Sequence, residues 1–140
     1  MLPLRLVFDT NLIVSAALKP NSLPRTALQM ALMKPSRLYV STDILFEYEE
    51  VLRRPELFVA KGVRHQLLQL IRNEGHIVKP TGSLHVCADP DDDVFLECAD
   101  ASRADYLVTG NVRHFPKYWK STKVVTAREF LDLVAPHLLG

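Results

Sequence analysis

Short apolar runs alternate with helix-like stretches along this chain, which leaves few folds open to it. The apolar runs fall at residues 4–8, 38–40, 76–78, 106–108 and 124–125. Helical stretches between them serve as crossovers, so successive strands can run in the same direction within one sheet. We therefore predict an α/β fold: a single three-layer α/β/α domain, residues 1–140, with a central, mostly parallel sheet covered by helices on both faces.

Turn and capping residues set the expected helix boundaries. Pro24 suits the first turn of a helix, Ser41 can cap one, and Pro55 stops one. The helices are expected over residues 22–33, from 41–43 to about 54, over 63–72, from the acidic turn 89–93 to about 103, and over 127–134. Residues 79–86 are expected to form a loop.

Composition and charge exclude several classes of protein. Of the 140 residues, 48% are hydrophobic and 24% are charged, as in ordinary globular domains. The net charge of +1 provides no general field for a polyanion, so nucleic acid would have to bind a local patch. No apolar run approaches the length of a membrane span. We expect a cytoplasmic protein with reduced thiols at Cys87 and Cys98.

Polar residues recur where strands end or helices begin. They are Asp9, Glu47, the cluster Asp89 to Asp93, and Asn111. In a parallel sheet such positions converge at one edge. Carboxylates that converge repel one another unless a cation joins them, and oxygen ligands favour Mg²⁺ or Mn²⁺ over zinc. The pattern therefore predicts a metal site.

Each of these motifs alone has a structural interpretation. Asp9 can cap a helix, aspartates in a first helical turn complement the helix dipole, and Glu47 can be a solvated helix residue. Helical periodicity places Asp92 beside the core face and predicts that Asp93 is solvated. Glu47 and Glu49 flank the apolar stripe of their helix on opposite sides, so periodicity does not choose between them.

Four stretches of the chain carry a family resemblance: Val7-Phe8-Asp9-Thr10-Asn11, residues 44–52, residues 89–99, and residues 104–111, which include Thr109-Gly110-Asn111. Together they resemble the PIN-domain family, especially its branch of toxin components of prokaryotic toxin–antitoxin systems. Residues 126–131 resemble the closing helix of the family. The resemblance spans nearly the whole chain, with the motifs in the family's order.

The resemblance implies a ribonuclease that uses one or two Mg²⁺ or Mn²⁺ ions. It assigns metal ligation and catalysis to Asp9, Glu47 and Asp92. Asn111 stands at the fourth acidic position, where an amide can coordinate a hard cation but adds no charge. Asp89 or Asp93 could compensate. Polar residues expected to support the site are Thr10, Asn11 and Ser15.

A basic and aromatic stretch follows Asn111 and is a candidate RNA-binding segment. Its predicted contacts are Arg113, His114, Lys117 and Lys120. The alternative is a solvated loop in which Phe115 and Trp119 pack on the domain. The resemblance also implies a small antitoxin partner and a homodimer, for which the apolar stripes of residues 22–33 and 63–72 are candidate surfaces.

Two other functions remain open at this stage. The missing charge at Asn111 suits a weak or inactive member that binds RNA or a protein. A phosphotransfer domain with Asp9 as the phosphoacceptor is less well supported, because Asn11 stands where a second aspartate is expected.

Overall fold

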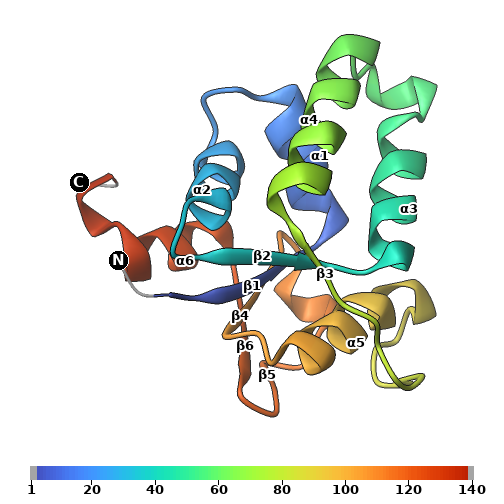
Figure 1. Cartoon of the computed structure of the whole chain (residues 1–140), viewed down its shortest axis with the longest axis vertical. Helices are drawn as coiled ribbons and strands as arrows, with labels where there is room; N and C mark the ends of the chain where they lie inside the picture. The colour runs from blue at the N-terminus through green and yellow to red at the C-terminus, as the bar shows by residue number, and fades with distance from the viewer. Residues whose placement is uncertain (1–2, 139–140) are drawn as a thin grey trace.

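A six-stranded sheet forms the centre of the molecule (Figure 1). The computed structural model describes residues 3–138. The strands are β1 (Arg5–Phe8), β2 (Arg37–Val40), β3 (His76–Ile77), β4 (Tyr106–Val108), β5 (Tyr118–Trp119) and β6 (Thr122–Val125). They lie in the order β3-β2-β1-β4-β6-β5, and only β5 runs antiparallel to its neighbour. The predicted mostly parallel α/β sheet is confirmed.

Within residues 3–138, six α-helices cover the two faces of the sheet. They are α1 (Thr10–Leu18), α2 (Leu23–Leu32), α3 (Thr42–Leu52), α4 (Lys61–Glu74), α5 (Asp93–Ser102) and α6 (Ala127–Val134). Figure 1 shows α1 to α4 above the sheet and α5 below it. Helix α6 packs against α2 and β4. None of the helices within residues 3–138 has the length and apolar character needed to span a bilayer.

The helices begin where the sequence supplies a capping side chain. The Ser22 hydroxyl accepts a hydrogen bond from the Arg25 backbone N–H, and that of Ser41 accepts one from Ile44. Thr126 and Glu129 form a reciprocal capping box at the start of α6. These contacts satisfy backbone donors that a helix leaves free in its first turn. The predicted positions of these three helices are confirmed.

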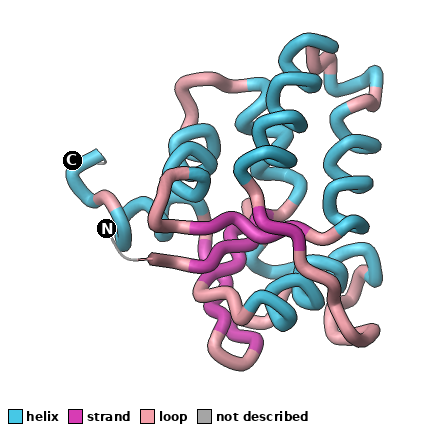
Figure 2. The backbone as a smooth tube through the Cα atoms, in the orientation of Figure 1, coloured by secondary structure: helices cyan, strands magenta, loops and turns pink. Residues whose placement is uncertain are grey.

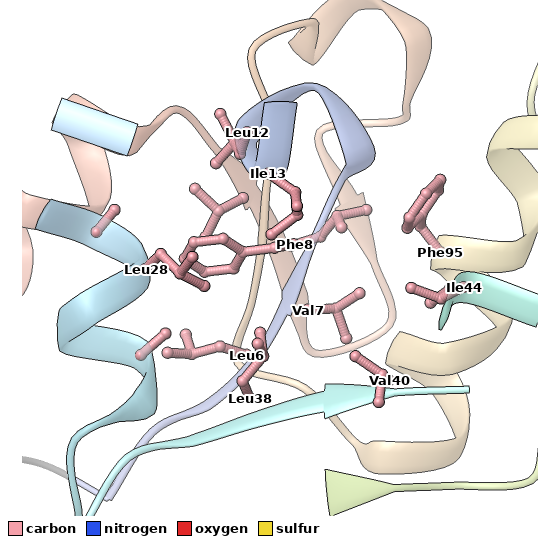
Figure 3. Close-up of a cluster of buried hydrophobic side chains, with 14 of the residues drawn as sticks. Leu6, Val7, Phe8, Leu12, Ile13, Leu28, Leu38, Val40, Ile44 and Phe95 are labelled. Atoms are coloured by element: carbon pink, nitrogen blue, oxygen red, sulfur yellow. The ribbon is translucent and has the colours of Figure 1, made fainter. Parts of the chain in front are cut away.

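The core surrounds β1, which lies between β2 and β4. Leu6, Val7 and Phe8 are fully buried, as expected for a central parallel strand covered on both faces. Figure 3 shows Phe8 among side chains that include Leu28 of α2 and Leu12 of α1. This packing fixes the end of β1 and therefore the position of Asp9, the next residue.

Two elements were not expected from the sequence. Helix α1 starts at Thr10, immediately after β1, and is absent from the predicted helices, although the interpretation of Asp9 as a helix cap agrees with it. Burial of Leu12 and Ile13 against the rest of the core stabilises the helix despite the β-branched residues in it. Strand β5 pairs with β6 as a short antiparallel edge, in the segment interpreted as a loop.

The loop between β3 and α5 runs along the α5 side of the molecule before the chain turns into that helix (Figure 2). The backbone N–H of Leu84 donates to Glu97, and those of Val86 and Cys87 donate to Asp93. Side chains of α5 therefore hold the loop in place and set where the acidic turn begins.

Candidate metal centre at the carboxyl edge of the sheet

Asp9 lies at the carboxyl end of β1 and caps α1. Its Oδ1 accepts a hydrogen bond of 2.7 Å from the Thr10 backbone N–H, and its Oδ2 accepts one of 2.7 Å from the Thr109 hydroxyl. The residue is 6% exposed. Its carboxylate is therefore held rigidly where β1 and β4 both end.

Glu47 reaches the same place from α3. The Thr10 hydroxyl donates to its Oε2, which links the second carboxylate to the residue that follows Asp9. Glu49, the alternative on this helix, pairs instead with Arg53 and Arg72 at 2.7 and 3.1 Å. The structure thus brings Glu47 to Asp9 and leaves Glu49 in a surface ion-pair network.

Asp92 enters from the other side of the sheet, at the last position before α5. Its side chain is 15% exposed, and its Oδ2 is buried without a hydrogen-bond donor among the described residues. The imidazole Nδ1 of His114 lies 3.5 Å from that oxygen. A buried carboxylate oxygen without a donor is costly, and a cation would satisfy it.

The three carboxylates influence one another electrostatically. Burial is the largest cause that raises the pKa of each above its ordinary value, and the charge of Asp9 adds to this effect at both Glu47 and Asp92. Together with the other nearby charges, these effects raise the pKa of Asp92 to about 6. Hydrogen bonds from Thr109 and Thr10 oppose this effect at Asp9 and Glu47. The site is therefore a region of concentrated negative charge.

The residues after β4 complete the edge. The Thr109 hydroxyl, which donates to Asp9, accepts the Asn111 backbone N–H at 2.9 Å. The Gly110 N–H donates to Oδ1 of Asn11 at 3.1 Å. Thr109 is not among the predicted site residues, although a polar residue directly after a buried strand indicates a position at the site. Asn111 itself is exposed at this edge.

The other acidic residues of the turn behave differently from one another. Asp89 is exposed, and its Oδ1 accepts the Asp91 N–H at 3.0 Å, so it caps the short turn Pro90–Asp92. Asp93 is 5% exposed, and its Oδ1 accepts the backbone N–H groups of Val86 and Cys87 at 3.1 and 2.8 Å. The prediction that Asp93 is solvated is wrong, because the preceding loop folds back over it.

The pKa of Asp93 reflects this environment. Burial alone would raise the pKa, but the N–H donors of Cys87 and Val86 outweigh it and lower the pKa below its ordinary value. Asp93 therefore remains a charged acceptor that anchors the loop. Its hydrogen bonds are made to the loop and not to the carboxylate cluster.

The predicted RNA-binding residues divide between the two edges of the sheet. Arg113 and His114 lie in the turn Val112–His114, next to Asn111, and both are exposed. Lys117 is exposed just before β5. Phe115 is buried and packs edge to face with Phe95, in agreement with the packing alternative.

Lys120 lies at the other edge of the sheet from Arg113 and His114. It occupies the β5–β6 turn at the amino end of β6, with a φ of 54°, and pairs with Asp100 at 2.7 Å. Because β5 runs antiparallel, it carries the chain from the acidic edge to the opposite one. Lys120 therefore lies away from His114, and its contact with RNA stays a prediction.

The donor set suits a hard divalent cation. It consists of carboxylate oxygens, one of them buried without a donor, and an amide oxygen nearby at Asn111. Within residues 3–138, no three His, Cys, Asp or Glu side chains are arranged as a preformed coordination shell. Both oxygens of Asp9 and one of Glu47 are hydrogen-bonded to Thr10 or Thr109 in this arrangement. Because the described side chains are not arranged as a coordination shell, metal binding would require them to move.

Comparisons with known proteins agree with this architecture. The sequence model of the PIN domain matches residues 5–113. The uncharacterized protein MJ1680 of Methanocaldococcus jannaschii is 29% identical over 141 aligned positions, which cover 92% of this chain and 90% of that protein. VapBC2 of Rickettsia felis, solved bound to a DNA fragment from its promoter, superposes with a TM-score of 0.61 at 17% identity. That alignment covers 87% of this chain and 98% of the other.

Fold and site together define a three-layer α/β protein with acidic side chains gathered at the carboxyl edge of its sheet. The match to residues 5–113 covers most of the chain. The chain belongs to the PIN domain family.

Proposed function

We propose that this protein is a metal-dependent endoribonuclease that hydrolyses RNA phosphodiester bonds. The observation that carries the proposal is the convergence of Asp9, Glu47 and Asp92 from three separate elements, with Oδ2 of Asp92 buried and lacking a donor. Three carboxylates gathered and partly buried in one place are costly to keep ionised, because burial and mutual repulsion both oppose ionisation. Perturbed titration of clustered acids is typical of functional sites.

Asp9, Glu47 and Asp92 would hold one or two Mg²⁺ or Mn²⁺ ions, with the Asn111 amide as a further oxygen ligand. Such an ion supplies a hydroxide at neutral pH and stabilises charge on the phosphoryl oxygens. Thr109 and Thr10 orient the carboxylates through their hydroxyls, and Asn11 fixes the backbone at Gly110. Ser15, one turn along α1 from Asn11, lies beside this frame.

Cations next to the carboxylates would contact the RNA backbone. Arg113 and His114 are exposed beside Asn111, and Lys117 follows on the way to β5. Nδ1 of His114 lies 3.5 Å from Oδ2 of Asp92, so its imidazole stands beside the carboxylates, where a phosphate contact would be needed. This local patch is needed because the chain has a net charge of only +1.

The test is cleavage of single-stranded RNA by the full chain in Mn²⁺, with EDTA as the metal-free arm. Asp9→Asn should lower the rate more than about a hundredfold, since even outer-shell partners of a metal site contribute about 10–100-fold. Asp132→Asn, an exposed aspartate of α6, is the matched control and should cleave normally. Equal Mn²⁺-dependent rates for wild type and Asp9→Asn would refute the proposed site.

A weak or inactive member that binds RNA or protein is the second candidate. It is supported by Asn111, which brings no charge to the fourth position, and by the engaged oxygens of Asp9 and Glu47. Calorimetric titration separates the two candidates. Mn²⁺ binding that Asp9→Asn abolishes supports the nuclease, whereas retained RNA affinity without metal binding at millimolar Mn²⁺ supports the binding module.

The family resemblance further suggests the toxin of a toxin–antitoxin pair, with a small protein partner or a second copy of the chain. Its support here is a cavity of about 680 Å³ between α2 and α4 that includes the apolar residues Leu28, Leu32, Leu67 and Leu70. Leu70 and Met33 are 44% and 52% exposed, respectively. Arg25 and Glu74 provide charges of both signs at its walls. Leu70→Glu should weaken partner binding or dimerisation, as measured by light scattering, without changing RNA cleavage.

A further inference from the structure

A second groove lies directly beside the carboxylate cluster. It has a volume of about 430 Å³ and opens between the start of α1, the start of α2, the end of β4 and the start of α6. Thr109 contributes to its wall and also donates to Asp9, so the groove and the acidic site share this residue. An occupant of the groove would therefore lie next to the residue that orients Asp9.

The lining combines apolar and polar surfaces. Leu23 and Pro24 offer an apolar side, while Asn11 and Ser15 offer an amide and a hydroxyl. Oδ1 of Asn11 is fixed by the Gly110 N–H, which leaves its Nδ2 available as a donor. Apolar walls with a few placed polar groups are the usual character of a small-molecule site, and roughly 300–1,000 Å³ is the usual size.

Arg128 brings the charge that a phosphate would require. It lines the groove from the first turn of α6, is exposed, and makes no ion pair among residues 3–138. Its neighbour Glu129 is committed to the capping box with Thr126. A cation in the first turn of a helix is electrostatically unfavourable, so helix stability does not explain Arg128.

We propose that this groove holds the nucleoside next to the scissile phosphate, with Arg128 on a phosphate of the strand and Asn11 and Ser15 on the sugar or base. The proposal rests on the proposed nuclease function and adds to it a substrate-binding subsite. Arg128 and Asn11 would then bind one nucleotide of a single-stranded RNA. The base of such a nucleotide is unstacked and can enter a groove.

The first experiment needs no catalysis. Adenosine 5′-monophosphate, adenosine and inorganic phosphate are titrated separately into the full chain in EDTA, and backbone amide shifts are followed by NMR. The nucleotide should shift Asn11, Ser15 and Arg128 at lower concentration than either fragment alone. Arg128→Gln should weaken nucleotide binding about tenfold, in the range expected for a hydrogen bond to a charged group. Arg37→Gln, an exposed arginine on β2, is the matched control and should bind normally.

The second experiment uses RNA cleavage in Mn²⁺. Arg128→Gln should raise KM about tenfold with little change in kcat. Ser15→Leu, which fills the groove and removes no charge, should also raise KM. Thermal unfolding of both variants checks the fold.

The two experiments separate failure of this subsite from failure of the nuclease proposal. Nucleotide binding at these residues without RNA cleavage would retain the subsite and reject the nuclease. Metal-dependent cleavage with unchanged KM in both variants, or amide shifts confined to residues outside the groove, would overturn the subsite. That result would also leave the groove open to a protein segment.

Discussion

The hydroxyl of Thr109 donates to Oδ2 of Asp9 at 2.7 Å, joining the ends of β4 and β1 across 100 positions of sequence. The same hydroxyl accepts the Asn111 N–H. Thr109 therefore orients the first carboxylate of the site and positions the amide residue beside it. The contact with Asp9 is buried, where an unsatisfied partner is costly, and the contact with Asn111 is partly buried.

Replacing this hydroxyl should weaken the metal site. Thr109→Val keeps the shape of the side chain but leaves Asp9 and the Asn111 N–H without their partner, so Mn²⁺ affinity should fall about 10–100-fold by calorimetry. Thr109→Ser should restore most of it. Thr122→Val is the matched control, because Thr122 is a buried threonine of the same sheet that bonds to the Ala104 carbonyl at the opposite edge. If both valine variants lost affinity equally, the effect would be one of general stability.

Asp92 and Asp93 should respond to mutation in opposite ways. Asp93→Ala removes the acceptor of two backbone N–H groups and should lower the free energy of unfolding by about 3 kcal/mol. Asp92→Ala should abolish Mn²⁺ binding without loss of stability in metal-free buffer. Urea unfolding and metal titration of both variants measure this, with exposed Asp91→Ala expected within about 0.5 kcal/mol of wild type. Equal destabilisation by both would contradict the assigned roles.

Asp92 and Asp93 also show what helical periodicity can and cannot predict from the sequence. Periodicity correctly placed Asp92 beside the core, but it predicted solvent at Asp93 because it considers one helix alone. The loop that covers Asp93 is held by hydrogen bonds from Val86 and Cys87, which no helical pattern predicts. Periodicity likewise did not choose between Glu47 and Glu49; the family resemblance selected Glu47, and the Thr10 hydroxyl of α1 links it to Asp9.

The sheet was predictable because its central strands are continuous apolar runs between helices, as in β1 and β4. Helix α1 was not, because residues 12–15 suit a strand as well as a helix locally, and only burial against the core decides. Lys120 was grouped with His114 because the two are close in sequence. The intervening antiparallel strand β5 separates them in space.

The site should make metal-free stability depend on pH. Burial and the charges of Asp9 and Asp89 raise the pKa of Asp92 from 3.8 to about 6, so the folded chain keeps a proton that the unfolded chain releases. The contribution of Asp92 to stability should therefore decrease as pH rises from about 4 to 6 and stay low above that range. In EDTA, Asp92→Asn should unfold at a higher temperature than wild type at pH 7.5, and the difference should shrink by pH 4.5. A constant difference across this range would contradict the assignment.

Adding a charge at Asn111 should strengthen the site toward metal and weaken it without metal. Asn111→Asp introduces a carboxylate at the acidic edge, so Mn²⁺ should bind more tightly and Mn²⁺-dependent cleavage should increase. In EDTA the added repulsion should lower the unfolding temperature. Asn21→Asp, at an exposed position before α2, provides the control for a new aspartate. Unchanged metal affinity in Asn111→Asp would show that this position lies outside the coordination shell.

A crystal soaked in Mn²⁺ at pH 7.5 and measured at the manganese absorption edge tests the central claim most directly. The account predicts an anomalous peak at the carboxyl edge of the sheet, with oxygens of Asp9 and Asp92 within about 2.0–2.3 Å and Glu47 bound directly or through water. A fully ordered edge without such a peak at millimolar Mn²⁺, or a peak only at surface carboxylates elsewhere, would contradict it.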